Sequence, residues 1–214
     1  MTDQTDLRRE VVFLVADGGM KEVLAGYLGR SHAHRGLGCA TFDFDPEQDV
    51  TIAPGRDSDV YRRHSGILTL YQATHRRAVV MVDEQWEGSP GAPAIAEHIE
   101  QGIAKDWAEY AVIVLQPELE AWLWQDNPNV AKALRCPADF REILAKSNHW
   151  PEGMAKPADP KGALEHLKRH HRADQSNAAF RRLAGAISVK GCIDPAFHKL
   201  RRTLCTWFPE MTYS

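Results

Sequence analysis

Val11-Val12-Phe13-Leu14-Val15-Ala16-Asp17-Gly18-Gly19 is the stretch that decides the fold. Its first six residues form a continuous apolar run rich in β-branched side chains, which is typical of a strand buried on both faces. Asp17 and the two glycines interrupt this run, and apolar residues then recur at helical spacing up to about residue 30. The pattern predicts a buried strand, a turn and a helix, which together form the first unit of an α/β fold.

The same order of a short apolar run and a helical pattern recurs along the chain. Two more buried strands are predicted at residues 78–82 (AVVMV) and 111–115 (AVIVL), and a further strand at residues 39–44 (CATFDF). Residues 45–59 are mostly polar and predict a loop. Because strands and helices alternate up to residue 126, we expect a mainly parallel sheet flanked by helices.

No strand is expected after residue 126. Five helical patterns, separated by Pro or Gly, follow at residues 128–135, 138–146, 160–171, 176–187 and 195–206. We therefore expect an α/β domain at residues 1–126, followed by an all-helical C-terminal region, residues 127–214, packed on it. Trp122 and Trp124 are expected to pack the sheet against these helices.

The charge of the chain is unevenly distributed. The 214 residues contain 26 Lys/Arg and 29 Asp/Glu; residues 156–214 hold 11 and 5 of these, which leaves 15 and 24 for the rest. A basic end on an acidic body favours contact with nucleic acid or with an acidic partner protein, although the solvated faces of amphipathic helices give the same asymmetry. The basic residues that we expect to contact nucleic acid are Lys168, Arg169, Arg172, Arg201 and Arg202.

Other features exclude several classes of protein. The four cysteines are widely spaced and form no CxxC pair, which argues against a disulfide framework or a structural zinc site. Without an apolar signal segment or an apolar run of about 20 residues, we expect a cytoplasmic protein with no membrane partner. The sequence contains no GxxxxGKS/T, GxGxxG or GxSxG motif, so a P-loop, a dinucleotide fingerprint and a hydrolase nucleophile are not supported.

Acidic residues follow three of the predicted strands. Asp17 follows the first strand, Asp83 and Glu84 the third, and Glu118 and Glu120 the fourth. Because the carboxyl ends of parallel strands meet at one edge of a sheet, we expect these side chains to lie together. Clustered carboxylates repel one another, and Mg²⁺ prefers such hard oxygen ligands. The pattern favours a magnesium site formed by these five residues, with helix capping as the alternative role for Asp17 and Glu118.

Three segments of the chain resemble TOPRIM-like proteins of bacterial anti-phage defence and mobile elements. They are Phe13–Gly18 followed by a helix, Val79–Asp83, and PELEAWLWQD at residues 117–126, which contains an E-x-W motif. The resemblance covers roughly residues 11–126. Two later stretches, KPADPK at residues 156–161 and DPAF at residues 194–197, are similar to the tails of small proteins in methylation-associated defence operons.

The TOPRIM family binds magnesium through a Glu after the first strand and an Asp-x-Asp after a later strand. Here Asp17 stands in place of that Glu, and Gln85 stands in place of the second Asp. The resemblance implies magnesium-dependent phosphodiester chemistry on nucleic acid, with Asp17, Asp83 and Glu118 as catalytic residues and other defence-system subunits as partners. The two departures favour a non-catalytic binding module as the alternative, and a small-molecule enzyme that uses the same acidic edge is a third hypothesis.

Overall fold

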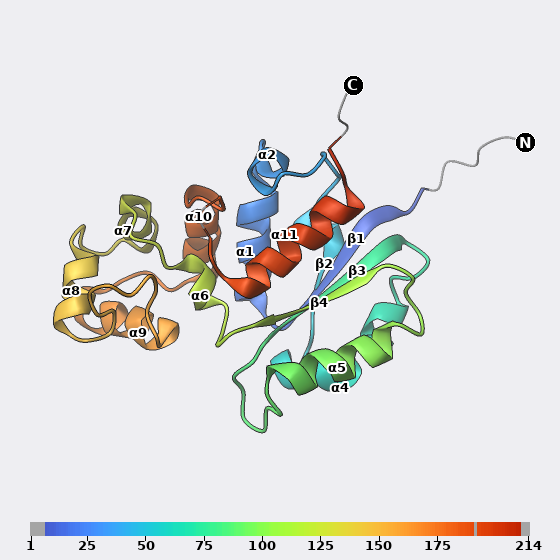
Figure 1. Ribbon diagram of the computed structural model, residues 1–214, viewed down its shortest axis with the longest axis horizontal. Coiled ribbons are helices and arrows are strands. Elements are labelled where there is room, and N and C mark those ends of the chain that lie inside the picture. Colours follow the sequence, from blue (N-terminus) through green and yellow to red (C-terminus); the bar gives the residue numbers. More distant parts are fainter. Residues whose placement is uncertain (1–6, 191, 211–214) are drawn as a thin grey trace, which may run out of the picture.

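The computed structural model describes residues 7–190 and 192–210, which form an α/β fold (Figure 1). Its strands are β1 (Arg9–Val15), β2 (Val50–Ile52), β3 (His75–Asp83) and β4 (Tyr110–Leu115). The helices that precede β4 are α1 (Gly18–Leu28), α2 (Ala33–Leu37), α3 (Pro46–Asp49), α4 (Arg56–Thr69) and α5 (Ala92–Ile103). The helices that follow β4 are α6 (Glu120–Leu123), α7 (Pro128–Leu134), α8 (Phe140–Lys146), α9 (Pro160–His171), α10 (Asn177–Ala186) and α11 (Pro195–Trp207).

The four strands form one parallel sheet in the order β2-β1-β3-β4. Its register places Phe13 beside both Val50 and Val79, and Val80 beside Val112. The inner strands β1 and β3 are buried along most of their length, which explains why their sequences are continuous apolar runs rather than alternating patterns. The predicted parallel α/β sheet with a helical C-terminal region is thus confirmed.

Helices cover both faces of the sheet (Figure 1). Helices α4 and α5 pack on one face, whereas α1 and α11 pack on the other. Trp122 and Trp124 are both buried. The Trp122 ring lies 5.1 Å from that of Phe197 in α11, a helix that covers the sheet, whereas the Trp124 ring lies 6.2 Å from that of Phe140 in α8, among the C-terminal helices. Among the described helices, none combines the length and the apolar character needed to cross a membrane.

A close contact between α1 and α10 holds the C-terminal region against the sheet. A Cβ atom added to Gly26 of α1 would lie 2.5 Å from the carbonyl oxygen of Arg181 and 2.7 Å from Cβ of Ala184, both in α10. The two helix backbones can approach this closely because glycine has no side chain there. Nearby, the buried hydroxyl group of Tyr27 donates a hydrogen bond to the Trp122 carbonyl (3.2 Å) and links α1 to α6.

The strand predicted at residues 39–44 is wrong. That segment has no regular structure, and the second strand lies at Val50–Ile52, inside the predicted loop. The Ala40 N–H donates to the Phe208 carbonyl (2.8 Å), and the Phe42 ring stacks on that of Phe208 with 4.3 Å between centroids. Because the residue that follows α11 provides these partners, the β-favouring side chains of the segment are satisfied outside the sheet.

A buried carboxylate, Asp49, lies at the amino edge of the sheet. Asp49 is 1% exposed; its Oδ2 accepts a hydrogen bond from Arg9 Nη2 (2.7 Å), and its Oδ1 lies 3.2 Å from His75 Nε2. Burial of Asp49 opposes ionisation, but the hydrogen bonds from Arg9 and His75 outweigh it and lower the pKa of Asp49. The carboxylate at this edge therefore has a cationic partner from β1.

Candidate acidic site

The structure brings four of the five predicted acidic residues together at the carboxyl edge of the sheet. Burial and then the negative charges of Asp57, Glu120, Asp17 and Glu118, in that order, together raise the pKa of Asp83 to about 9. All four carboxylates act on the same group, which places them within electrostatic range of Asp83. The carboxyl edge therefore holds a cluster of five carboxylates, here called the acidic cluster (Asp17, Asp57, Asp83, Glu118 and Glu120).

Hydrogen bonds from the backbone fix three members of the acidic cluster. Asp17 Oδ1 accepts from the Met20 N–H (2.9 Å) and caps α1, so its predicted capping role is observed and coexists with its place in the cluster. Asp57 Oδ1 accepts from the Asp83 N–H (2.9 Å), and Asp83 Oδ1 accepts from the Leu119 N–H (3.0 Å). These bonds tie the amino end of α4, the end of β3 and the segment before α6 to one another.

Glu118 connects the acidic cluster to the C-terminal helices. Its side chain is largely buried; Oε1 accepts from the Lys161 N–H (3.0 Å), and Oε2 lies 3.9 Å from Lys161 Nζ. Burial raises the pKa of Glu118, although the charge of Lys161 opposes the effect. Helix α9 thus supplies a cation to this edge of the sheet.

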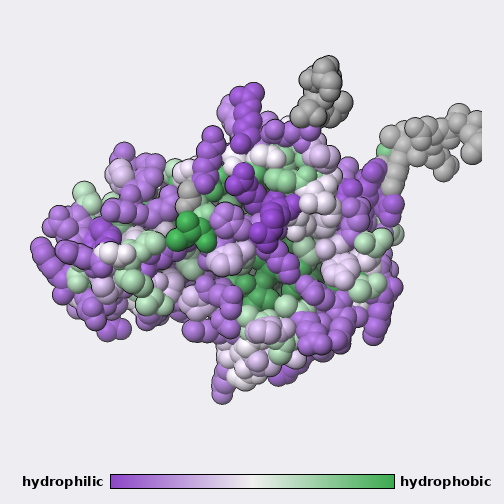
Figure 2. All heavy atoms as spheres, viewed as in Figure 1, coloured by the Kyte–Doolittle hydropathy of each residue, from purple (hydrophilic) through white to green (hydrophobic). Residues whose placement is uncertain are grey.

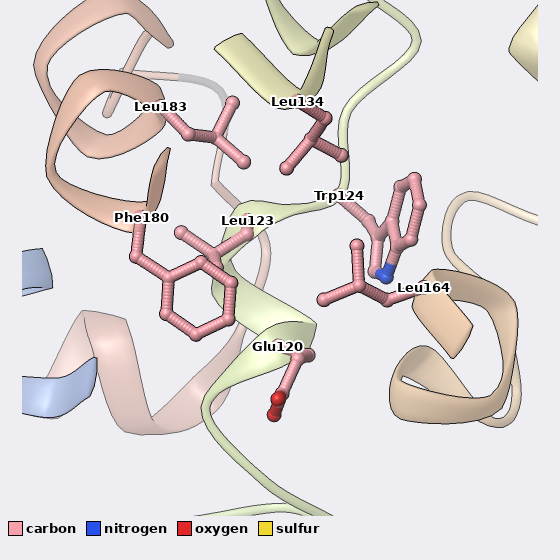
Figure 3. Close-up of a pocket in the computed structure, with 7 residues that line it drawn as sticks. All are labelled: Glu120, Leu123, Trp124, Leu134, Leu164, Phe180 and Leu183. Carbon is pink, nitrogen blue, oxygen red and sulfur yellow. The ribbon is translucent and has the colours of Figure 1, made fainter. Parts of the chain in front are cut away.

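Glu120 is the member of the cluster that titrates near neutral pH. Burial and then the charge of Glu118 raise the pKa of Glu120 to about 7. Figure 3 shows its carboxylate turned away from the apolar side chains of Leu123 and Phe180, which line a small cavity beside it. That cavity measures about 10 Å³, room for one water molecule at most, so a ligand would have to bind on the carboxylate side of Glu120.

Glu84, the fifth predicted ligand, lies apart from the cluster. Its Oε1 accepts from the Ala92 N–H (3.1 Å) at the start of α5 and lies 3.5 Å from Gln116 Nε2. The carboxylate of Glu84 is therefore used at the amino end of a helix, where a negative charge is favoured. Gln85, which replaces the second Asp of the family pattern, is exposed.

Asp57 is the member of the cluster that the sequence patterns do not predict. It lies in the first turn of α4, in the polar segment that predicts a loop. Asp57 follows the short strand Val50–Ile52, which the sequence pattern does not predict. Because ligands bind beyond the carboxyl ends of parallel strands, a prediction of that strand would also have indicated Asp57.

The acidic cluster has the chemistry of a divalent cation site without its geometry. Its donors are carboxylate oxygens, which suit Mg²⁺ and Mn²⁺. Within residues 7–190 and 192–210, however, no three His, Cys, Asp or Glu side chains are placed so that they could hold one metal ion. One oxygen each of Asp17, Asp57, Asp83 and Glu118 accepts a backbone hydrogen bond, which holds these carboxylates in their present orientations.

The five basic residues expected to contact nucleic acid form two groups. Lys168 and Arg169 line an open groove of about 500 Å³ on α9, and Arg172 ends that helix with a left-handed φ of 57°. Arg201 and Arg202 line an open groove of about 440 Å³ on α11, where Arg201 Nε also donates to a carbonyl of α2 (2.6 Å). Because α9 packs on α6 and α8 whereas α11 packs on β4 and α2, the two groups belong to different parts of the surface (Figure 1).

Comparison with known proteins identified no relative of this chain. No family model matches it. No curated protein and no solved structure matches it either. The resemblance to TOPRIM-like proteins therefore rests on the sequence segments quoted above.

Proposed function

We propose that this chain is a component of a bacterial anti-phage defence system and acts on nucleic acid through a cation-dependent site at the acidic cluster. The observation that supports the site is the set of raised pKa values of its carboxyl groups. Lys161 and Arg56 lower the pKa values of their neighbours, yet those of Asp83, Glu118 and Glu120 remain raised. Burial is the main cause of these raised pKa values and repulsion between the carboxylates adds to it, and a divalent cation would relieve that repulsion. The assignment to a defence system rests on the resemblance of three sequence segments to TOPRIM-like proteins.

In this proposal Asp17, Asp83 and Glu118 are the catalytic residues, and Glu120 joins them in holding the cation. A bound Mg²⁺ would polarise a phosphoryl oxygen and activate water for phosphodiester cleavage. Glu120, with a pKa of about 7, can take up and return a proton at neutral pH and is suited to general acid–base catalysis. Asp83, with a pKa of about 9, keeps its proton until a cation replaces it.

The proton balance of cation binding tests the proposal. Calorimetric titration with Mg²⁺ or Mn²⁺ in two buffers of different ionisation heat should show that binding releases protons, because Asp83 and Glu120 hold them. Asp83→Asn should remain folded but lose cation binding and any cleavage of labelled DNA. Asp126→Asn, at an exposed acidic residue, is the matched control. Cleavage retained by Asp83→Asn, or cation binding without proton release, would contradict the proposal.

A non-catalytic binding module of the same defence complex is the second candidate. Two observations favour it: Gln85 is exposed where the family places an acid, and Glu84 is used to cap α5. In this case the acidic cluster is the remainder of a former site. Calorimetry separates the two candidates, since a module would give no binding heat and no shift in melting temperature at millimolar Mg²⁺ or Mn²⁺.

A further inference from the structure

Two cysteines that are far apart in the sequence meet where α11 packs on the segment after α2. Cys39 is fully buried just beyond α2, and Cys205 is partly buried near the end of α11. The Cys205 thiol donates hydrogen bonds to the carbonyl oxygens of Leu37 (3.3 Å) and Gly38 (3.1 Å). Since the Gly38 carbonyl is bonded to the nitrogen of Cys39, Cys205 Sγ lies within about 6 Å of Cys39 Cα. Both thiols are free, so the fold places an unbonded pair of cysteines side by side.

The charges around the two thiols also connect them. Burial and then the nearby Cys205 and Glu210 raise the pKa of Cys39 to about 11, whereas Arg201 opposes the rise. One thiol affects the other in this way only at short range. Arg201 Nε donates to the Leu37 carbonyl (2.6 Å), the same oxygen that accepts from Cys205. A cation therefore lies beside both sulfur atoms, where it favours the thiolate form.

Solvent reaches the two cysteines unequally. Cys205 lines the open groove of about 440 Å³ on α11, together with His198, Arg201 and Arg202. Figure 2 shows strongly hydrophilic side chains gathered over this helix. Cys39, in contrast, is 0% exposed. A small polar oxidant in the groove therefore meets Cys205 first, and Cys39 is the second thiol to react.

We propose that Cys205 and Cys39 form a modification site, at which a hydroperoxide oxidises the two thiols to a reversible disulfide. The Cys205 thiolate attacks one peroxide oxygen, the O–O bond breaks, and the other oxygen takes up a proton and leaves as water or an alcohol. Cys39 gives up its proton and attacks the sulfur of the resulting sulfenic acid. The S–S bond forms, the S–O bond breaks, and a water molecule leaves. The two thiols together lose two electrons, which the peroxide gains.

The disulfide would join the segment after α2 to the last helix. Helix α11 covers one face of the sheet, and Phe208, which follows it, already contacts Ala40 and Phe42. A bond between residues 39 and 205 closes a loop over most of the chain and so restricts the unfolded state strongly. The oxidised protein should therefore be more stable to heat than the reduced protein, with α11 fixed to the segment after α2.

Peptide mapping of the peroxide-treated chain tests the proposal. The full-length, fully reduced protein is treated with hydrogen peroxide, its remaining thiols are alkylated, and a tryptic digest is analysed by mass spectrometry. We expect a disulfide that joins the Cys39 and Cys205 peptides and that dithiothreitol reverses. Peroxide should also raise the melting temperature by at least about 5 °C. Cys136→Ser, at a partly buried cysteine elsewhere, is the matched control and should keep both effects, whereas Cys205→Ser should lose both.

Several outcomes would overturn this assignment. In one, Cys39 is still alkylated after Cys205 has been oxidised, because Cys205 then ends as a sulfinic acid. In another, the disulfide joins two protein molecules and appears as a dimer on a non-reducing gel. A melting temperature that does not respond to peroxide would also count against it. Cys39→Ser should lose the disulfide as well; should this buried substitution prevent folding, the peptide map of the wild type and Cys205→Ser decide.

Discussion

Replacing Asp83 with Asn should make the protein more stable at neutral pH. In the folded chain Asp83 stays protonated because burial and four neighbouring carboxylates raise its pKa to about 9. In the unfolded chain the same carboxyl group ionises at its ordinary value of 3.8. Folding at pH 7 therefore includes the cost of protonating this group. Asn carries no charge, and its side-chain oxygen can still accept the hydrogen bond from the Leu119 N–H.

The size of the effect follows from the distance between the two pKa values and the working pH. At pH 7 the buffer lies 3.2 pH units above the unfolded-state value of 3.8, and each unit is worth about 1.36 kcal/mol, so the cost is about 4 kcal/mol. Because the folded-state pKa is raised, wild-type stability should fall as pH rises from about 4 to about 9. The gain from Asp83→Asn should shrink to under about 2 kcal/mol at pH 5.

Urea unfolding followed by circular dichroism at pH 5, 7 and 8.5, with a chelator present, measures this prediction. Asp126→Asn, at an exposed position, should change the free energy of unfolding by about 0.5 kcal/mol or less at each pH. An Asp83→Asn protein that is no more stable than the wild type at pH 7, or a gain that does not depend on pH, would refute the reasoning. If the cation site is also correct, millimolar Mg²⁺ should stabilise the wild type alone and reduce the difference.

Three further changes test other parts of the structure. Raising the pH from 6 to 8 should increase Mn²⁺ affinity at least ten-fold, because Glu120 loses its proton near pH 7; calorimetry at the two pH values measures it. Gly26→Ala should destabilise the chain by about 1–3 kcal/mol because the new methyl group meets α10, whereas Gly66→Ala, with nothing within 4 Å, should be neutral or slightly stabilising in urea unfolding. Asp49→Ala should cost about 3–5 kcal/mol by leaving buried partners unpaired, whereas Asp43→Asn, at a carboxylate 76% exposed, should cost under about 1 kcal/mol in thermal unfolding.

The sheet was predictable because buried parallel strands have a simple sequence pattern. The apolar runs at residues 78–82 and 111–115 lie in strands, as does the run at residues 11–16 except for its last residue, since both faces of the sheet are covered by helices. The same reasoning placed Asp17, Asp83 and Glu118 at one edge, because the order of strands and helices leaves little choice of topology. Local pattern and global fold agree at these positions.

The errors arise where distant residues decide the local structure. Residues 39–44 have β-favouring side chains, but Phe208 provides their hydrogen bond and their ring contact from the other end of the chain. β2 has three residues, of which Val50 is buried, so it carries no recognisable pattern. Asp57 was missed together with β2. The direction of the Glu84 carboxylate depends on where α5 begins, which the Gly- and Pro-rich segment before that helix does not reveal.

The contact at Gly26 has a consequence for how the chain is made. Helix α1 is synthesised early, but its partner α10 begins at Asn177, so the ribosome must release most of the chain before the two can meet. Until then the face of α1 that α10 will cover stays open, and contacts between such distant residues form slowly. A nascent chain therefore presents an apolar surface for most of its synthesis. Truncation before residue 177 should give a protein that aggregates rather than a smaller working domain, and the latest helices thus protect the earliest one.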